Sequence, residues 1–158
     1  PVVTNPIPAS YPRLCPYLAV DGAAAAMAFY IDVFGFTPRG GVMTSPDGRI
    51  GHAELTLGDS VLMVADEWPE VGNLAPTTVG GSPVTLSIYV EDVDTVHARA
   101  IAAGAESMRE PEDQFYGDRM ASVRDPWGHR WSVGSHLEDV DDAEMARRMA
   151  DAFGDQSG

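Results

Sequence analysis

The chain has 158 residues, of which 44% are hydrophobic and 22% are charged, a balance typical of a folded protein rather than a disordered one. Its 24 acidic residues against 10 basic ones give a formal net charge of −14, which repels phosphate backbones and excludes nucleic acid as an expected partner. No apolar run approaches the roughly 20 residues that a membrane-spanning helix needs, so no membrane partner is expected either.

The N-terminal stretch PVVTNPIPAS lacks the basic segment and apolar core of a secretory signal. The single Cys15 cannot form an internal disulfide. Both features favour a cytoplasmic protein. Four prolines within residues 1–12 predict an extended N-terminal arm.

Residues 13–68 have the pattern of a βαβββ module. In RLCPYLAV, apolar residues alternate with the other residues as in a strand, and Pro16 favours a place at a sheet edge. The segment AAAAMAFYIDVF carries a helical apolar stripe, with Asp21 as the expected N-terminal cap and Gly35 as the expected C-terminal one. Three short strands follow in GVMTS, RIGHAELTL and VLMVADEW, separated by the turn sequences PDG and GDS.

The Pro- and Gly-rich residues 69–83 predict a linker, and residues 84–134 then repeat the order of the first module. We expect a strand in VTLSIYV and a helix in TVHARAIAAG capped by Asp92 or Asp94, with His97 on the surface or flank of that helix. A short strand near Ser107–Arg109, a loop over residues 110–118 and the hairpin RMASVRDPWGHRWSV complete the module.

The two modules share landmarks at a constant spacing. VDGAAAAMAFYIDVFGF begins at Val20 and VEDVDTVHARAIAAGAE at Val90, and the hairpin glycines Gly58 and Gly128 are also 70 positions apart. Because the first strand, the helix and the last turn all recur at this spacing, the sequence indicates an internal duplication. The predicted fold is therefore α+β, with two tandem βαβββ modules followed by an acidic helical tail over residues 135–158, capped by Asp139 or Asp141.

In each module one helix can cover one sheet face, which leaves a second face of mixed polarity. Such a face suits a ligand cavity with a few fixed polar groups, and two sheets set side by side would line one trough from both modules. The alternative is an ordinary solvated sheet face. Alternation assigns to it Arg13, Cys15, Tyr17, His52, Glu54, Met63, Thr85, Ser87, Tyr89, Ser122, Arg130 and Ser132.

The segments PYLAVDGAAAAMAFYIDVFGF, SPDGRIGHAELTLGDSVLMVADEW, SIYVEDVDTVHARAIAAGA and YGDRMASVRDPWGHRWSV resemble, in this order, the vicinal oxygen chelate superfamily. That superfamily includes glyoxalase I, bleomycin-resistance proteins and extradiol dioxygenases. FYGDR, DPWGHRW and SHLEDV are similar to its PhnB-like branch. The resemblance covers about residues 13–150 and implies the glyoxalase/bleomycin-resistance fold, a cupped mixed sheet often completed in a homodimer.

In metal-using members of that superfamily, four His, Glu or Gln side chains hold a divalent cation that acts as a Lewis acid. The four positions fall here on Cys15, Met63, Thr85 and Ser132. Hydroxyl and thioether groups are poor ligands for a hard divalent ion. We therefore expect no metal and no other cofactor, and the sequence leaves open whether the protein is an enzyme.

His52 and Glu54 are the candidate catalytic residues, because they lie two positions apart on one strand face. They can act as an acid/base pair or as two ligands of a displaced metal site. The interpretation favoured here is a plain hydrogen-bonded pair or a pair that orients a ligand.

The favoured function is metal-independent binding of a small cationic or aromatic molecule in the trough between the modules. The alternative is a metal-dependent or acid/base enzyme: a lyase, an isomerase or a dioxygenase. Adjacent aromatic residues in the loop over residues 110–118 suit a lid or a hydrophobic plug, and Arg119 is expected to pair with Asp118 or to reach an anionic ligand group. Expected partners are the ligand and a second copy of the chain, and the tail helix can dock another protein. The expected ligand-binding residues are Tyr17, His52, Glu54, Met63, Trp68, Thr85, Tyr89, Phe115, Tyr116, Arg119 and Ser132.

Overall fold

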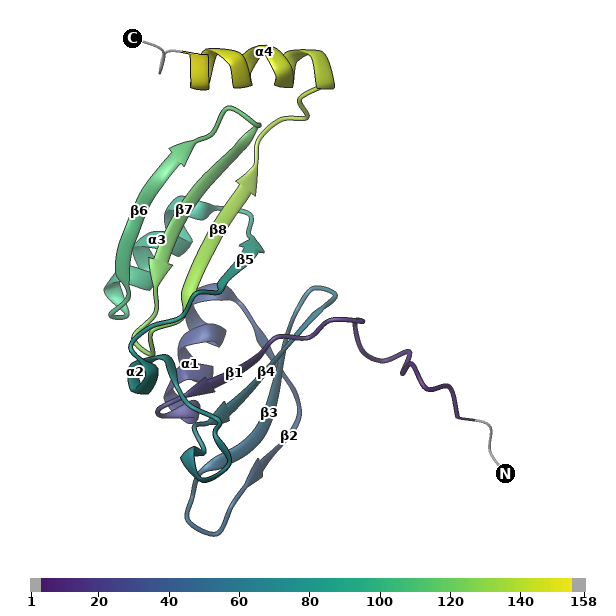
Figure 1. Cartoon of the computed structure of the whole chain (residues 1–158), viewed down its shortest axis with the longest axis vertical. Coiled ribbons are helices and arrows are strands. Elements are labelled where there is room, and N and C mark those ends of the chain that lie inside the picture. Colours follow the sequence, from purple (N-terminus) through teal and green to yellow (C-terminus); the bar gives the residue numbers. More distant parts are fainter. Residues whose placement is uncertain (1–3, 155–158) are drawn as a thin grey trace. The chain divides into compact units, whose positions relative to one another are not determined.

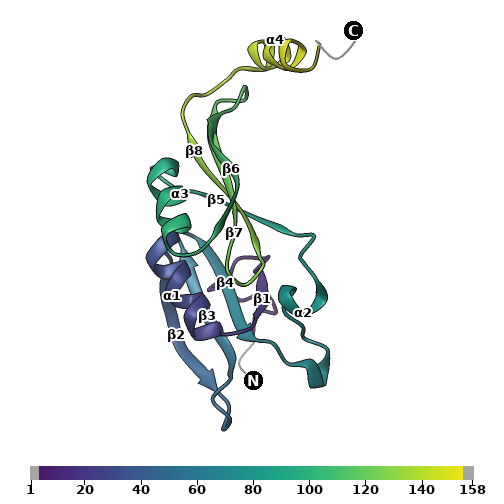
Figure 2. The ribbon, with the colours of Figure 1, turned by 90° about the vertical axis from the view of Figure 1, so that its left-hand side faces the viewer.

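The computed structural model describes residues 4–154, so residues 1–3 of the expected arm and residues 155–158 of the expected tail lie outside the described residues. Its contacts divide the chain into two units, Pro1–Ser82 and Pro83–Gly158. Each unit has the order βαβββ, with a four-stranded mixed sheet and a long helix against one face of it (Figures 1 and 2). The predicted α+β fold of two tandem βαβββ modules is therefore confirmed. Within residues 4–154, no helix has the length and apolar character that crossing a membrane requires.

Unit 1 builds its sheet around a parallel pair. Its elements are β1 (Tyr17–Val20), α1 (Ala23–Phe34), β2 (Thr37–Thr44), β3 (Ile50–Leu57) and β4 (Ser60–Asp66). The strand order is β1-β4-β3-β2, with β1 parallel to β4 and the other neighbours antiparallel. As predicted, β1 lies at the edge of this sheet. Ala53, Leu55 and Val64 are fully buried on the side that α1 covers, because alternate residues of a strand point to one face.

Unit 2 repeats this plan. Its elements are β5 (Thr85–Tyr89), α3 (Val93–Ala102), β6 (Glu106–Asp113), β7 (Asp118–Arg124) and β8 (Arg130–His136). The strand order β5-β8-β7-β6 is the order of unit 1, with β5 parallel to β8. The helix α3 packs against β6, β7 and β8, and the core of the unit contains Val123, Trp131 and Val133.

The strand β6 is longer than the predicted strand near Ser107–Arg109. It continues to Asp113 and so includes Pro111, which the sequence pattern assigned to a loop. A proline is tolerated there because β6 lies at a sheet edge, where one row of N–H groups needs no partner in the sheet. After an irregularity, pairing with β7 resumes at Glu112 and Met120.

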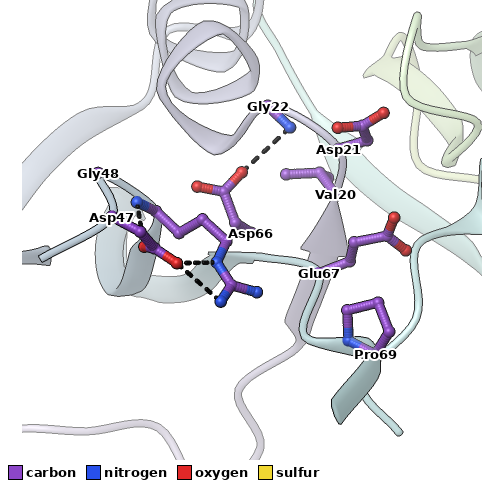
Figure 3. Close-up of a pocket in the computed structure, with 9 residues that line it drawn as sticks. Val20, Asp21, Gly22, Asp47, Gly48, Asp66, Glu67 and Pro69 are labelled. Atoms are coloured by element: carbon purple, nitrogen blue, oxygen red, sulfur yellow. Dashed lines mark hydrogen bonds and ion pairs between the residues drawn. The ribbon is translucent and has the colours of Figure 1, made fainter. Parts of the chain in front are cut away.

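The N-terminus of α1 is capped differently from the prediction. Asp21 does not cap it, and the N-cap residue Gly22 has no side chain to do so. Asp66, at the end of β4, takes this role from across the sheet. Its Oδ1 accepts a hydrogen bond from the N–H of Gly22 at 3.1 Å (Figure 3). The same atom accepts a second one from the N–H of Ala23 at 2.8 Å.

The helix α3 is capped both locally and from the sheet. Asp92 accepts a hydrogen bond from the N–H of Thr95 at 3.1 Å, as predicted. Ser135, near the end of β8, accepts one from the N–H of Val93 at 3.0 Å. In both units, therefore, the last strand supplies a side chain to the start of the long helix.

His97 is buried, which corrects the prediction of a surface position. Its ring lies on the side of α3 that faces β6, where Nε2 is 2.9 Å from the hydroxyl of Ser107 and Nδ1 is 3.8 Å from Glu110. A hydrogen-bond partner on the sheet lets this polar ring occupy a core position.

The connection between the units contains two short helical turns, η1 (Pro69–Val71) and α2 (Pro76–Val79). Glu67 holds the second turn, because its carboxylate accepts hydrogen bonds from the N–H of Ala75 at 2.9 Å and from the hydroxyl of Thr78 at 2.7 Å. These bonds lower the pKa of Glu67.

The tail helix α4 (Asp142–Phe153) is the last helix of unit 2 (Figure 1). None of its residues is buried. Asp141 caps it by accepting a hydrogen bond from the N–H of Glu144 at 2.9 Å, which confirms one of the two predicted caps. Arg148 ties the helix to the rest of unit 2 through Glu138 and the carbonyl of Phe115.

Candidate functional site

The side of the unit 1 sheet opposite α1 carries a row of large side chains, which we call face 1. Tyr17 is paired with Met63, Met63 with Glu54, and Glu54 with Arg39, across four strands. Cross-strand partners share a face and lie about 5 Å apart at Cβ. His52 belongs to the same face, because it lies two residues before Glu54 on β3.

Glu54 is the centre of a hydrogen-bond network on face 1. Its carboxylate accepts hydrogen bonds from the hydroxyl of Tyr11 at 2.8 Å and from Nε of Arg39 at 3.0 Å, and it lies 2.9 Å from Nε2 of His52. The hydroxyl of Tyr17 lies 2.7 Å from Nδ1 of the same histidine. The hydrogen bond with His52, followed by those from Tyr11 and Arg39, lowers the pKa of Glu54 although partial burial opposes the shift.

This geometry disfavours Glu54 as a proton donor or acceptor in catalysis. A carboxylate whose pKa is lowered is ionised at neutral pH and a weak base, whereas a general acid needs a raised pKa. Partial burial and then the charge of Glu54 raise the pKa of Tyr17, so its hydroxyl stays protonated at pH 7. Face 1 therefore presents a fixed anion and a neutral hydroxyl.

The superfamily's four metal-ligand positions occupy the expected strands or lie next to them. Met63 stands between Tyr17 and Glu54 on face 1, and Cys15, just before β1, donates its thiol to the carbonyl of Pro12 at 3.6 Å. Among residues 4–154, no three His, Cys, Asp or Glu side chains gather in a way that could hold a metal ion. Metal independence stays a prediction.

The side of the unit 2 sheet opposite α3, which we call face 2, is lined mainly by hydroxyl groups. Ser87 is paired with Ser132 and Ser132 with Ser122, while Thr85 is paired with Arg130. None of these hydroxyls forms a hydrogen bond with another group in the described part of the chain. The Nε atom of Arg130 is buried, and it also has no hydrogen-bond partner among residues 4–154.

A second cluster, not predicted from the sequence, lies at the end of face 2. The hydroxyl of Tyr89 donates to the buried carboxylate of Asp118 at 2.7 Å, and Nδ1 of His136 lies 2.7 Å from the same carboxylate. Nε2 of His136 is 2.9 Å from Asp139. The hairpin offered a signal, because counting outward from the pair Arg124–Arg130 places Asp118 opposite His136.

We expect this cluster to make the free energy of unfolding depend on pH. The hydrogen bonds with Asp118 and Asp139 raise the pKa of His136 above 6.5, and those from His136 and Tyr89 lower the pKa of Asp118 below 3.8. The contribution of His136 to the free energy of unfolding is complete below the pKa of His136 in the unfolded chain. It is lost as pH rises through the raised pKa of the folded protein. That of Asp118 is lost as pH falls through its lowered folded pKa, so the pair stabilises most between about pH 4 and 6.5.

Urea unfolding of the wild type and His136→Gln from pH 5 to pH 9 measures this effect. The difference between the two proteins should be largest near pH 5 and shrink above pH 7. A difference that stays constant over the whole range would show that the charge of His136 contributes nothing.

The remaining predicted site residues already have partners. Arg119 pairs with Asp94 and Asp113, each at 2.7 Å, rather than with Asp118. The two pairs share a guanidinium that lies at the surface.

The aromatic residues of the loop before β7 pack on one another and on the tail. Phe115 meets Tyr116 and Phe153 edge to face, with ring centroids 5.3 and 5.8 Å apart. This packing favours the plug over the lid. In unit 1, Trp68 lies against the guanidinium of Arg49, with Cζ 3.7 Å from its ring centroid.

A pocket of about 460 Å³ opens near the start of α1, and none of the predicted site residues is in its lining (Figure 3). Most of its charged side chains are used internally: Asp66 caps α1, Arg49 pairs with Asp47 at 2.8 Å, and Glu67 holds α2. A lining whose polar groups are satisfied offers few of the free partners that a polar ligand needs. It consists of Val20, Asp21, Gly22, Asp47, Gly48, Arg49, Asp66, Glu67 and Pro69.

Known structures with a similar fold include proteins from Micromonospora and Streptomyces. TioX from Micromonospora sp. ML1 is 29% identical, with a TM-score of 0.59, and the match covers 80% of this chain and 99% of that one. TnmS3 from Streptomyces sp. CB03234, described as an antibiotic binding protein, is 21% identical with a TM-score of 0.57, and covers 77% and 93% of the two chains. At that identity the likeness of TnmS3 shows the fold alone.

Sequence comparison gives the family directly. An uncharacterised protein of Mycobacterium tuberculosis strain H37Rv is 39% identical over 142 residues, which cover 88% of this chain and 83% of that protein. Residues 13–133 match the family model of the Glyoxalase/Bleomycin resistance protein/Dioxygenase superfamily. The chain therefore belongs to the glyoxalase/bleomycin resistance protein/dioxygenase superfamily.

Proposed function

We propose that this protein binds a small molecule on the sheet faces that its helices leave uncovered, without the help of a metal ion. The observation that carries the proposal is the buried Nε of Arg130, which lacks a partner among residues 4–154. Folded proteins leave few buried donors unpaired, since each one costs about 1–3 kcal/mol. An acceptor oxygen of a ligand would remove that cost.

The rest of face 2 supports the same function. Hydroxyls such as those of Ser122 and Ser132 can each donate and accept, and none is used within the described chain. Tyr17 on face 1 and Tyr89 at the end of face 2 are 50% and 61% exposed, so they offer aromatic surface for packing. TnmS3, which shares the fold, is described as an antibiotic binding protein.

Charge narrows the class of ligand. The net charge of −14 attracts a cation at long range, and Arg130 favours an oxygen acceptor at contact. An aromatic compound that carries an amine and a carbonyl or carboxylate oxygen satisfies both requirements.

Titration calorimetry against cationic glycopeptide and planar aromatic antibiotics tests this function. At least one compound should bind the wild type, and Arg130→Gln should weaken that binding by about 10- to 100-fold, the value of a charged hydrogen bond. Arg147→Gln is the matched control, because its side chain is 69% exposed on α4 and it removes the same charge. Absence of binding across the panel, or an equal loss in both variants, would refute the proposal.

An acid/base or metal-dependent enzyme is the second candidate. The contacts from Tyr17 to His52 at 2.7 Å and from His52 to Glu54 at 2.9 Å favour it, since they could relay a proton. Metal analysis of protein purified without chelator separates the two functions, and a stoichiometric metal ion would favour the enzyme. Turnover that survives His52→Ala would remove His52 from the mechanism.

We also infer that the chain belongs to the PhnB-like branch, works in the cytoplasm and forms a homodimer. The motifs FYGDR and DPWGHRW and the single Cys15 support the first two inferences. Sedimentation equilibrium tests the third, because a homodimer would give about twice the chain mass of 16.9 kDa.

A further inference from the structure

The N-terminal arm places one aromatic side chain on face 1. Residues 4–16 form neither helix nor strand, and they run past the sheet of unit 1 (Figure 1). The hydroxyl of Tyr11 lies 2.8 and 3.1 Å from the two carboxylate oxygens of Glu54. Its ring lies under the guanidinium of Arg39, with Cζ 4.4 Å from the ring centroid.

The groups that hold Tyr11 belong to the sheet and remain there without it. Arg39 comes from β2 and Glu54 from β3, where each is the cross-strand partner of the other. They pair directly at 3.0 Å, with side chains that are 29% and 11% exposed. The sheet thus presents a carboxylate that accepts a hydroxyl and a cation that stacks on a flat ring, which is a pair of groups complementary to a phenol.

The arm itself is weakly attached. Apart from Tyr11, the one bond that joins residues 4–12 to the sheet within the described chain runs from Arg39 to the carbonyl of Ser10, at 2.7 Å. The side chains of residues 4–10 are exposed. One hydrogen bond to a carboxylate and one cation–π contact hold the arm, and the conformational entropy lost on ordering the arm residues opposes them. Because these contributions oppose each other, release of the arm requires little free energy.

We propose that Tyr11 is an internal occupant of a phenol-binding site formed by Glu54 and Arg39, and that a phenolic ring of the ligand takes its place when the arm lifts. This inference rests on the proposed small-molecule function and names one part of the ligand. Because the arm and the ligand compete, the apparent affinity falls in proportion to the fraction of molecules whose site is open.

Binding of 4-cresol, measured by titration calorimetry, tests the proposal. An arm seated in about nine-tenths of the molecules implies that Tyr11→Ala binds 4-cresol about tenfold more tightly than the wild type. Tyr11→Phe keeps the ring but loses the hydroxyl bond, so its affinity should lie between the two. In the Tyr11→Ala protein, adding Glu54→Gln should remove most of the gain, and 4-methylanisole, which has no hydroxyl to donate, should bind more weakly than 4-cresol.

Trypsin cleavage after the exposed Arg13 of the wild type gives an independent readout of the arm. Saturating 4-cresol should accelerate this cleavage if it displaces Tyr11. Equal or weaker binding of 4-cresol by Tyr11→Ala, no binding by any variant, or unchanged cleavage would overturn the proposal. Antibiotic binding is measured separately, so the phenol site can fail while the small-molecule function stands.

Discussion

Replacing Asp66 with alanine is expected to destabilise the protein by about 2–4 kcal/mol. The carboxylate serves three backbone donors at once: Oδ1 accepts from Gly22 and Ala23, and Oδ2 accepts from Ile50 at 2.7 Å. Alanine removes all three bonds, so the first turn of α1 and the start of β3 lose their acceptors together. Urea unfolding followed by circular dichroism measures the change in the free energy of unfolding.

Asp21→Ala is the matched control. Asp21 is the acidic residue nearest the helix in the sequence, but it is exposed and does not cap α1. Its removal should change stability by no more than about 0.5 kcal/mol. Equal effects of the two substitutions would show that the cap from β4 does not stabilise α1.

Replacing Gly117 with alanine is expected to cost about 2–4 kcal/mol. Gly117 has φ +95°, and an added Cβ would collide with the backbone carbonyl oxygen of Glu138. That oxygen belongs to the chain itself and cannot rotate away as a flexible side chain would. The carbonyl of Gly117 also accepts hydrogen bonds from Leu137 at 2.9 Å and Glu138 at 3.1 Å, so a shift here would loosen the loop that carries Phe115 and Tyr116.

Gly80→Ala separates backbone strain from the collision. Gly80 has a similar φ of +96°, but an added Cβ meets nothing within 4 Å. The strained backbone conformation alone should therefore lower the free energy of unfolding of this variant, by about 1 kcal/mol. Thermal unfolding of the two variants should rank Gly117→Ala well below Gly80→Ala, and equal melting temperatures would contradict the close approach to Glu138.

The order of elements was predictable because it depends on local patterns. Helical periodicity predicted the bounds of α1. The 70-residue spacing then predicted the same order of elements in the second module. Caps supplied by neighbours in the chain, such as Asp92 and Asp141, were also predictable. The cap from Asp66 was not, because it joins residues 43 positions apart, and only the pairing of β1 with β4 brings them together.

The part of the candidate site that depends on local sequence patterns was also predictable. Alternation along β3 placed His52 and Glu54 on one face, and they do lie within hydrogen-bond distance. The position of Tyr11 on face 1 was not predicted, because an irregular arm has no periodicity that indicates where its side chains lie. His97 was assigned to the surface because a histidine on a helix flank carries no sequence signal of its buried partner Ser107.

The most direct test of a ligand site on the sheet faces is a ¹⁵N–¹H spectrum of the wild type titrated with the tightest-binding compound of the antibiotic panel. The largest chemical-shift changes should fall on Ser87, Ser122, Arg130 and Ser132, and they should saturate with the calorimetric affinity. Changes concentrated instead on the lining of the pocket near α1, around Arg49, would contradict the account.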